Sequence, residues 1–251
     1  MPQPPKTVVD QVIERLTAII NWADHNNSRA GYFAALYRRV TVKVKQGIDD
    51  GFFEDGPRMQ RLDVIFANRY LDAFEQWRGG GESSAAWGYA FAVTGQFWPI
   101  VLQHLLMGMN AHINLDLGIA AARTVPAPEL PLLRPDFDRI NTILSGLVGD
   151  VQNELAEVWA PLRILNRFLG GTEDKIINFS MGRARDFAWS VAGQLAPLNQ
   201  AEQHHWIAKL DADIVIVAKL IRRPGFKLGL VTKAVRLGER TTIPETIRIL
   251  S

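Results

Sequence analysis

The chain contains no cysteine among its 251 residues. Catalysis by a thiolate, zinc held by cysteine and iron–sulfur clusters are therefore excluded, and any metal ion must be held by His, Asp, Glu or backbone oxygen atoms. The sequence also lacks a glycine-rich phosphate loop, a Gly-x-Ser-x-Gly elbow and a His-Glu-x-x-His pair. No nucleotide cofactor is expected.

A large excess of charge is absent as well, because the formal net charge is +2. This balance does not favour nucleic acid as a partner. The basic residues are concentrated locally, since six of them and no acidic residue lie within residues 219–236. A solvated basic arm is the simpler interpretation, and contact with an anionic surface or with lipid headgroups is the alternative.

No uninterrupted hydrophobic run is long enough to suggest a transmembrane segment. The most apolar stretch, Trp98 to Ala122, has the necessary length but contains several polar residues, among them two histidines and an aspartate. The first ten residues contain no apolar signal core. We therefore expect a cytoplasmic protein without a transmembrane segment.

Strand-like alternation is scarce, and apolar residues recur at helical spacing along most of the chain. This pattern predicts an all-α fold, a single-domain bundle of about eight to ten helices over residues 1–223, with a buried central helix at about 98–123. Residues 224–251 are expected to form a basic helical arm that packs on the bundle or extends from it. Four prolines within residues 124–135 predict an extended loop, followed by a helix with Asp136 as its N-cap.

The central helix is the most informative element, because its apolar residues lie all round it and its polar residues need buried partners. At about 100° per residue the polar positions form two stripes. The first stripe contains His104, Gly108, His112 and Asp116, and the second contains Gln103, Asn110 and Asn114. His112 and Asp116 are four residues apart, so they could form a dyad or both bind one ion. His104 lies about 12 Å from His112 along the axis, further along the same groove.

Other helices are expected to direct polar groups inward. Asp63 falls on the apolar face of the helix predicted for residues 58–77 and is a candidate base or ligand. Asn141 lies on the apolar stripe of the helix after the proline-rich segment. Arg185 and Trp189 are four residues apart on a later helix.

The central string resembles the signature of a bacterial family described as domain of unknown function 5995. It consists of Gln103-His104, then Gly108-Met109-Asn110-Ala111-His112-Ile113-Asn114, then Asp116-Leu117. Segments around Arg69-Tyr70, Asp136-Phe137, Ile140-Asn141 and Ala184-Arg185 support the resemblance, which spans roughly residues 60–195. The resemblance implies an α-helical, enzyme-like domain and lends no reaction.

The leading hypothesis is an enzyme that acts on a small, largely apolar metabolite in a buried interhelical pocket. General acid–base chemistry would then catalyse isomerisation, cyclisation or elimination without a cofactor. The catalytic candidates are His112, Asp116, His104 and Asp63. The candidates for holding the substrate are Gln103, Asn110, Asn114, Asn141, Arg185 and Trp189.

Two alternatives remain open at this point. In the first, His112 and Asp116 bind one divalent metal, zinc or iron, in a hydrolase or oxygenase. In the second, the protein binds a ligand or a partner without catalysis, and the polar residues form a structural network. The sequence is also compatible with a homo-oligomer.

Overall fold

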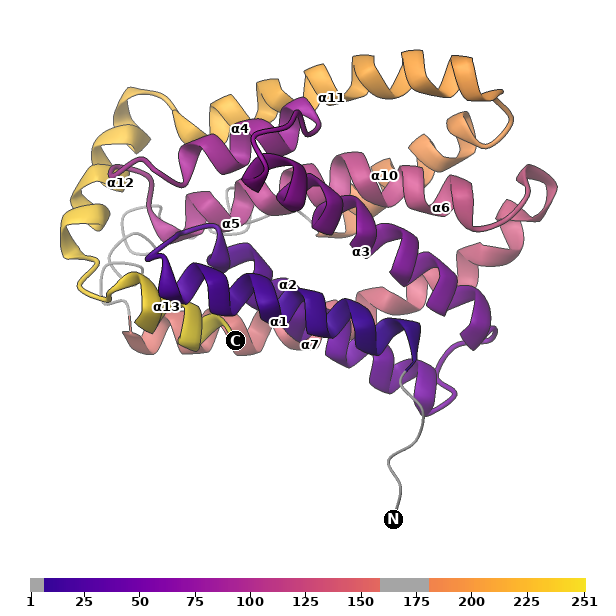
Figure 1. The fold of residues 1–251 in the computed structure, drawn as a ribbon, viewed down its shortest axis with the longest axis horizontal. Helices are drawn as coiled ribbons and strands as arrows, with labels where there is room; N and C mark the ends of the chain where they lie inside the picture. Colours follow the sequence, from indigo (N-terminus) through magenta and orange to yellow (C-terminus); the bar gives the residue numbers. More distant parts are fainter. Residues whose placement is uncertain (1–6, 159–180) are drawn as a thin grey trace.

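A computed structural model describes residues 7–158 and 181–251, with the backbone alone described for residues 145–158 (Figure 1). Within these ranges the regular elements are helices and no strand is present, which confirms the predicted all-α fold. The elements are α1 (Val8–His25), α2 (Gly31–Asp49), α3 (Gly56–Arg78), α4 (Ala85–Val93), α5 (Val101–Met109), η1 (Asn110–Leu117), α6 (Gly118–Thr124), η2 (Ala127–Glu129), α7 (Leu130–Val158), α10 (Met181–Leu195), α11 (Gln200–Arg222), α12 (Phe226–Gly238) and α13 (Ile243–Leu250).

The predicted central helix is one continuous helical run made of α5, η1 and α6. In Figure 1 it crosses the middle of the molecule between α11 and α3. The middle segment, η1, is a π-helix, whose backbone hydrogen bonds join residues five apart instead of four. All eight residues of η1 are buried. The side chains of this segment are therefore enclosed by neighbouring helices.

Close helix packing surrounds the run. A Cβ atom at Gly118, directly after η1, would lie 2.7 Å from the carbonyl oxygen of Ala188 on α10, so glycine is required there. A Cβ atom at Gly108 would lie 2.6 Å from Cδ2 of Phe33 on α2. The missing side chain at Gly108 thus makes room for the Phe33 ring. Within the described ranges no helix combines the length and apolar character needed to cross a bilayer.

The segment 124–135 is not the extended loop that its prolines predict. It contains the short helix η2 and the first turns of α7, and Pro135 lies inside α7. Pro131 is the second residue of α7, where a missing N–H costs nothing. Buried Leu133 and Phe137 fix this part of α7 against the core.

Asp136 is likewise not the N-cap of its own helix. Its carboxylate accepts hydrogen bonds from the backbone N–H groups of Glu54 and Asp55, at 2.7 and 3.0 Å, and from Nη2 of Arg58 at 3.0 Å. Burial opposes ionisation of the Asp136 carboxyl, but these bonds outweigh it and lower its pKa. Asp136 therefore stabilises the beginning of α3 from a distant part of the chain.

The C-terminal arm packs on the bundle. In α13, Ile247 and Leu250 are buried in a cluster with Ala23 of α1 and Tyr32 of α2. The preceding helix, α12, lies at one end of the molecule, at the left of Figure 1. Its one fully enclosed apolar side chain is Val235, which packs with Ile100.

Candidate active site

Asp116 is the centre of the buried polar cluster. It lies on η1 and its side chain is fully enclosed. Its Oδ1 accepts a 2.6 Å hydrogen bond from Nε of Arg69 on α3, and its Oδ2 accepts a 2.7 Å bond from Nε1 of Trp87 on α4. Burial raises the pKa of this carboxyl, but the Arg69 charge and the neighbouring donors reverse the effect, so the pKa is lowered. Asp116 is therefore a carboxylate at neutral pH.

His112 lies beside this carboxylate, inside a group of aromatic rings. Its Nδ1 is 3.6 Å from Oδ2 of Asp116, which is longer than a hydrogen bond. The Phe66 ring stacks on the imidazole with centroids 3.6 Å apart, and the Tyr37 ring meets it edge-on at 4.3 Å. Neither imidazole nitrogen has a hydrogen-bond partner among the described residues. Burial lowers the pKa of His112 and the nearby carboxylate offsets this in part, so the imidazole is neutral.

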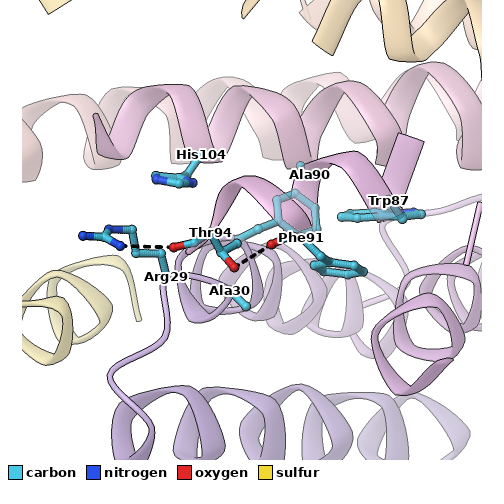
Figure 2. A pocket seen from close by; sticks show the side chains of 9 residues that line it. Arg29, Ala30, Trp87, Ala90, Phe91, Thr94 and His104 are labelled. Atoms are coloured by element: carbon cyan, nitrogen blue, oxygen red, sulfur yellow. Dashed lines mark hydrogen bonds between the residues drawn. The ribbon is translucent and has the colours of Figure 1, made fainter. Parts of the chain in front are cut away.

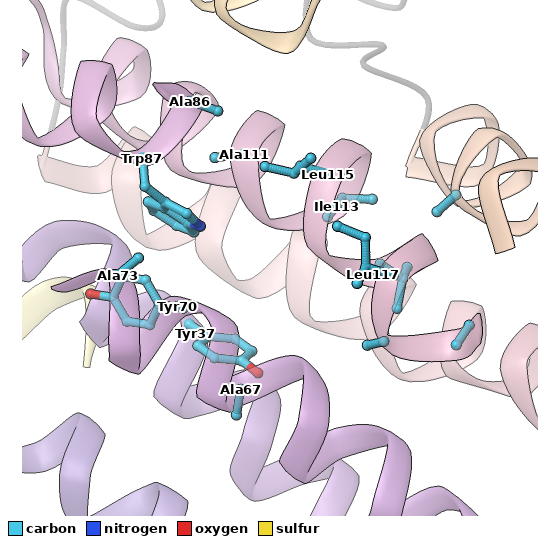
Figure 3. Packing of buried hydrophobic residues seen from close by; sticks show 14 of the residues in the cluster. Tyr37, Ala67, Tyr70, Ala73, Ala86, Trp87, Ala111, Ile113, Leu115 and Leu117 are labelled. Carbon is cyan, nitrogen blue, oxygen red and sulfur yellow. The ribbon is translucent and has the colours of Figure 1, made fainter. Parts of the chain in front are cut away.

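Three of the rings that contact His112 are labelled in Figure 3, where the Trp87 ring reaches from α4 toward α3 and the Tyr37 and Tyr70 rings lie beside Ala67 and Ala73. The hydroxyl groups of Tyr37 and Tyr70 are buried without a hydrogen-bond partner in the described part of the chain. Burial raises the pKa of both hydroxyls, and both are neutral. The surroundings of His112 are thus mostly aromatic carbon, with the hydroxyl groups of Tyr37 and Tyr70 as isolated polar atoms.

Asp63 is a second buried carboxyl group, one helical turn before Ala67 on α3. Its Oδ2 has no hydrogen-bond partner among residues 7–158 and 181–251. Burial raises the pKa of Asp63 to about 7. Both Asp63 and Asp116 act electrostatically on the Tyr37 hydroxyl, and the Tyr37 ring also contacts the imidazole of His112.

His104 does not join this cluster. It lies on α5 and lines a small hollow of about 20 Å³, room for about one water molecule, together with Arg29, Phe33, Trp87 and Thr94. Figure 2 shows the imidazole on the side of α5 that faces Arg29 and Thr94. The rings of Phe33 and Trp87 lie between the hollow and the buried cluster of His112 and Asp116. Their centroids are 5.4 and 6.2 Å from the centroid of the His112 ring.

The imidazole of His104 is neutral. Burial is the main cause of its lowered pKa of about 3, and the guanidinium groups of Arg29, Arg236 and Arg222 add to the effect. The Pro99 carbonyl opposes the shift, although no ring nitrogen makes a hydrogen bond of normal geometry within the described ranges. A neutral imidazole surrounded by cations suits recognition better than proton transfer near neutral pH.

Two predicted substrate-binding residues, Gln103 and Asn110, bond to α11 instead, and a third, Asn114, bonds to Asn110. The Gln103 amide donates to the carbonyls of Ile221 and Arg222 at 2.8 and 3.3 Å. The Asn110 amide donates to the Ile214 carbonyl at 3.0 Å, and Asn114 donates to Asn110 at 3.0 Å. The second polar stripe therefore attaches the central run to α11, on a different side from His112.

The remaining three candidates are found at the contact between α7 and α10. Arg185 donates to the Phe137 carbonyl, and its guanidinium carbon lies 4.3 Å from the centre of the Phe137 ring. Burial is the main cause of the lowered pKa of Arg185, about 10, so the side chain stays charged. The Trp189 ring packs 5.0 Å from that of Phe137, and Asn141 is half-buried one turn further along α7. Arg185 and Trp189 thus both contact Phe137 of α7.

Arg69 and Trp87 are the functional partners that sequence reasoning missed. A buried carboxylate such as Asp116 requires donors, and Arg69, on the helix whose apolar face contains Phe66, Tyr70 and Phe74, was a signal for one of them. Nothing in the sequence indicated a role for Trp87, because a tryptophan on a helix is as often part of an apolar core as it is a hydrogen-bond donor to a buried carboxylate.

The residues do not fit a divalent metal at His112 and Asp116. Both carboxylate oxygens of Asp116 already accept hydrogen bonds, and the guanidinium of Arg69 would repel a cation at this position. Among the residues described, no three His, Asp or Glu side chains converge on one point. No step of the chemistry below is assigned to a metal ion.

The fold and this centre define an all-α protein with a His–Asp pair on a buried π-helix. The chain belongs to the family of unknown function DUF5995, whose sequence pattern matches residues 9–224. This confirms the resemblance seen in the central string. No curated protein and no solved structure matches the chain.

Proposed function

We propose that the protein is an enzyme that catalyses an acid–base reaction of a small, largely apolar metabolite at His112 and Asp63. The observation that carries the proposal is the pair of buried carboxyl groups with opposite pKa shifts, Asp63 raised and Asp116 lowered, together with a neutral imidazole, His112, whose Nδ1 lies 3.6 Å from Asp116. Environments that separate the pKa values of two like groups are typical of acid–base active sites.

The roles follow from the protonation states. Neutral His112 accepts a proton from a carbon or oxygen atom of the substrate, and the carboxylate of Asp116 stabilises the imidazolium that forms. Arg69 and Trp87 hold Asp116 in place and are positioning residues. Asp63, with its pKa of about 7, returns a proton to a second substrate atom. One proton leaves the substrate for His112 and one arrives from Asp63, so isomerisation and cyclisation balance in the substrate. Transfer of a proton from the His112 imidazolium to the Asp63 carboxylate, directly or through water, then restores the enzyme without a further reactant.

The aromatic rings around His112 define the substrate class. Phe33, Phe66, Tyr70 and Trp87 offer apolar contact and few hydrogen-bonding groups. The hollow beside His104 is the access route, because Phe33 and Trp87 form its inner wall and also contact the His112 ring. Movement of these two rings would open a path from the hollow to the centre.

A non-catalytic role is the second candidate, favoured by the complete hydrogen bonding of Asp116 and by the attachment of Asn110 and Gln103 to α11. In that case the polar centre specifies the packing of the core. The unpartnered nitrogens of His112 argue against it, since a structural histidine normally has a hydrogen-bond partner.

Solvent isotope incorporation separates the two candidates. Purified protein is incubated in D2O with apolar metabolites extracted from cells, and products are followed by mass spectrometry. Removal of a proton by His112 and return of a deuteron to carbon by Asp63 should place deuterium in at least one metabolite, and His112→Gln should abolish this labelling. Equal labelling by wild type and variant, or none by either, would support the structural role.

A further inference from the structure

Helix α12 is apolar on two opposite faces. Its inner face places Val235 in the core, while Phe226, Leu230 and Leu237 are 90, 65 and 72% exposed. At about 100° per residue these three side chains fall within roughly 40° of one another, opposite Val235. An amphipathic helix needs only the inner apolar face to pack on its protein. The outer one is left for another partner.

Two aromatic residues of the loop between α4 and α5 extend this outer face. Phe97 and Trp98 are 54 and 44% exposed. The Lys233 ammonium lies 5.7 Å from the centre of the Trp98 ring, and the Arg236 guanidinium carbon lies 4.6 Å from that of Phe97. We call the surface formed by Phe97, Trp98, Phe226, Leu230 and Leu237 the α12 patch. Helix α12, which carries three of these residues, lies at the left of Figure 1.

The charge along α12 is mainly basic, although Arg236 forms a 2.8 Å ion pair with the buried side chain of Glu239. No acidic residue occurs between Asp213 and Glu239, and six basic residues do: Lys219, Arg222, Arg223, Lys227, Lys233 and Arg236. Lys227 and Lys233 are exposed on α12 itself, on either side of its outer apolar stripe. Apolar and aromatic side chains flanked by basic ones complement an anionic bilayer, whose headgroups attract the charges while its acyl region accepts the apolar groups.

We propose that the α12 patch docks the protein on the surface of anionic lipid bilayers. Phe226, Leu230 and Leu237 enter the boundary between headgroups and acyl chains, with Trp98 at the interface, while Lys227 and Lys233 contact lipid phosphates. The proposal does not depend on the acid–base chemistry at His112. The patch adjoins the hollow, however, since Arg236 contacts Phe97 and also acts electrostatically on His104. A docked protein could therefore receive an apolar ligand directly from the bilayer.

Vesicle co-sedimentation of the full chain tests the proposal. Vesicles of equal parts phosphatidylcholine and phosphatidylserine should retain the protein, vesicles of phosphatidylcholine alone should retain much less, and added salt should weaken the binding. Retention that is equal on both compositions, or absent from both, would overturn the proposal.

Matched surface variants locate the contact. Leu237→Ser should reduce partitioning about tenfold, whereas Leu132→Ser, at a leucine of α7 that is 61% exposed, should not. Lys233→Glu should reduce binding to the anionic vesicles at least about fivefold, and Lys209→Glu on α11 should reduce it much less. Circular dichroism checks that all four variants are folded. Equal effects of patch and control variants would overturn the proposal, as would a dimer that buries the patch and fails to bind vesicles.

Discussion

Asp63 on α3 and Asp116 on η1 are both buried carboxyl groups that act on the Tyr37 hydroxyl, yet their pKa values shift in opposite directions. The difference comes from their partners. Asp116 has the charge of Arg69 and the indole N–H of Trp87, whereas burial is the sole cause of the shift at Asp63. A protonated and an ionised carboxyl group can therefore both act on Tyr37 near neutral pH.

Asp63→Asn should stabilise the folded protein at neutral and alkaline pH. In the unfolded chain this carboxyl ionises near the ordinary aspartate pKa of 3.8, but in the folded chain it keeps its proton up to about pH 7. The free energy of unfolding of the wild type therefore falls as the pH rises between these values, by up to about 4 kcal/mol. The asparagine side chain of the variant does not ionise, so its free energy of unfolding does not fall in this way.

Urea denaturation across this pH range measures the effect. The advantage of the variant should vanish below about pH 4, where both states of the wild type are protonated. Asp213→Asn, at an exposed position of α11, is the control for removing a carboxylate from the surface. A variant that is less stable than wild type at pH 8 would contradict burial as the cause of the raised pKa.

Arg69→Met should destabilise the protein strongly, because it leaves the buried carboxylate of Asp116 without its charged partner. We expect a loss of about 3 kcal/mol in the free energy of unfolding. The double variant Arg69→Met with Asp116→Asn should regain part of this, since the amide carries no charge. As a control, Arg15→Met breaks ion pairs with exposed Asp72 and Glu75 and should cost less than about 1 kcal/mol. Equal losses at Arg69 and Arg15 would show that Asp116 is not ionised.

Gly108→Ala should destabilise the central run and narrow the hollow, because the added Cβ would lie 2.6 Å from the Phe33 ring. Overpacking of this kind costs about 1–3 kcal/mol. Gly193→Ala in α10 is the matched control, since a Cβ there meets nothing within 4 Å, and it should gain up to about 1 kcal/mol from helix propensity. Thermal denaturation of both variants checks the contrast, and shifts of the same sign would refute the packing at Phe33.

Helical spacing predicted the fold class and the position of the central run, because both depend on local periodicity. It also predicted that His112 and Asp116 are neighbours, which the 3.6 Å separation supports. It could not predict the π-helix at η1, since the same apolar pattern is compatible with either hydrogen-bond register. The proline-rich segment was misinterpreted because tertiary contacts of Leu133, Asp136 and Phe137 outweigh local preferences.

The sequence could not predict the partners of Asp116, for a different reason. Arg69 and Trp87 lie 47 and 29 residues away along the chain, and their approach depends on how α3 and α4 pack against η1. The same holds for the division of the polar residues between two sides of the central run. Gln103 and Asn110 resemble substrate ligands in the sequence, but their amides bond to the backbone of α11.

The most direct test of the acid–base centre is the deuterium incorporation catalysed by Asp63→Asn in D2O, at about pH 6, where the wild-type carboxyl carries its proton. We expect this variant to be more stable than the wild type and to lose labelling by at least about a hundredfold, as removal of a general acid requires. Such a combination assigns Asp63 to catalysis, because a damaged fold cannot explain it. Labelling at the wild-type rate by the stabilised variant would contradict the account.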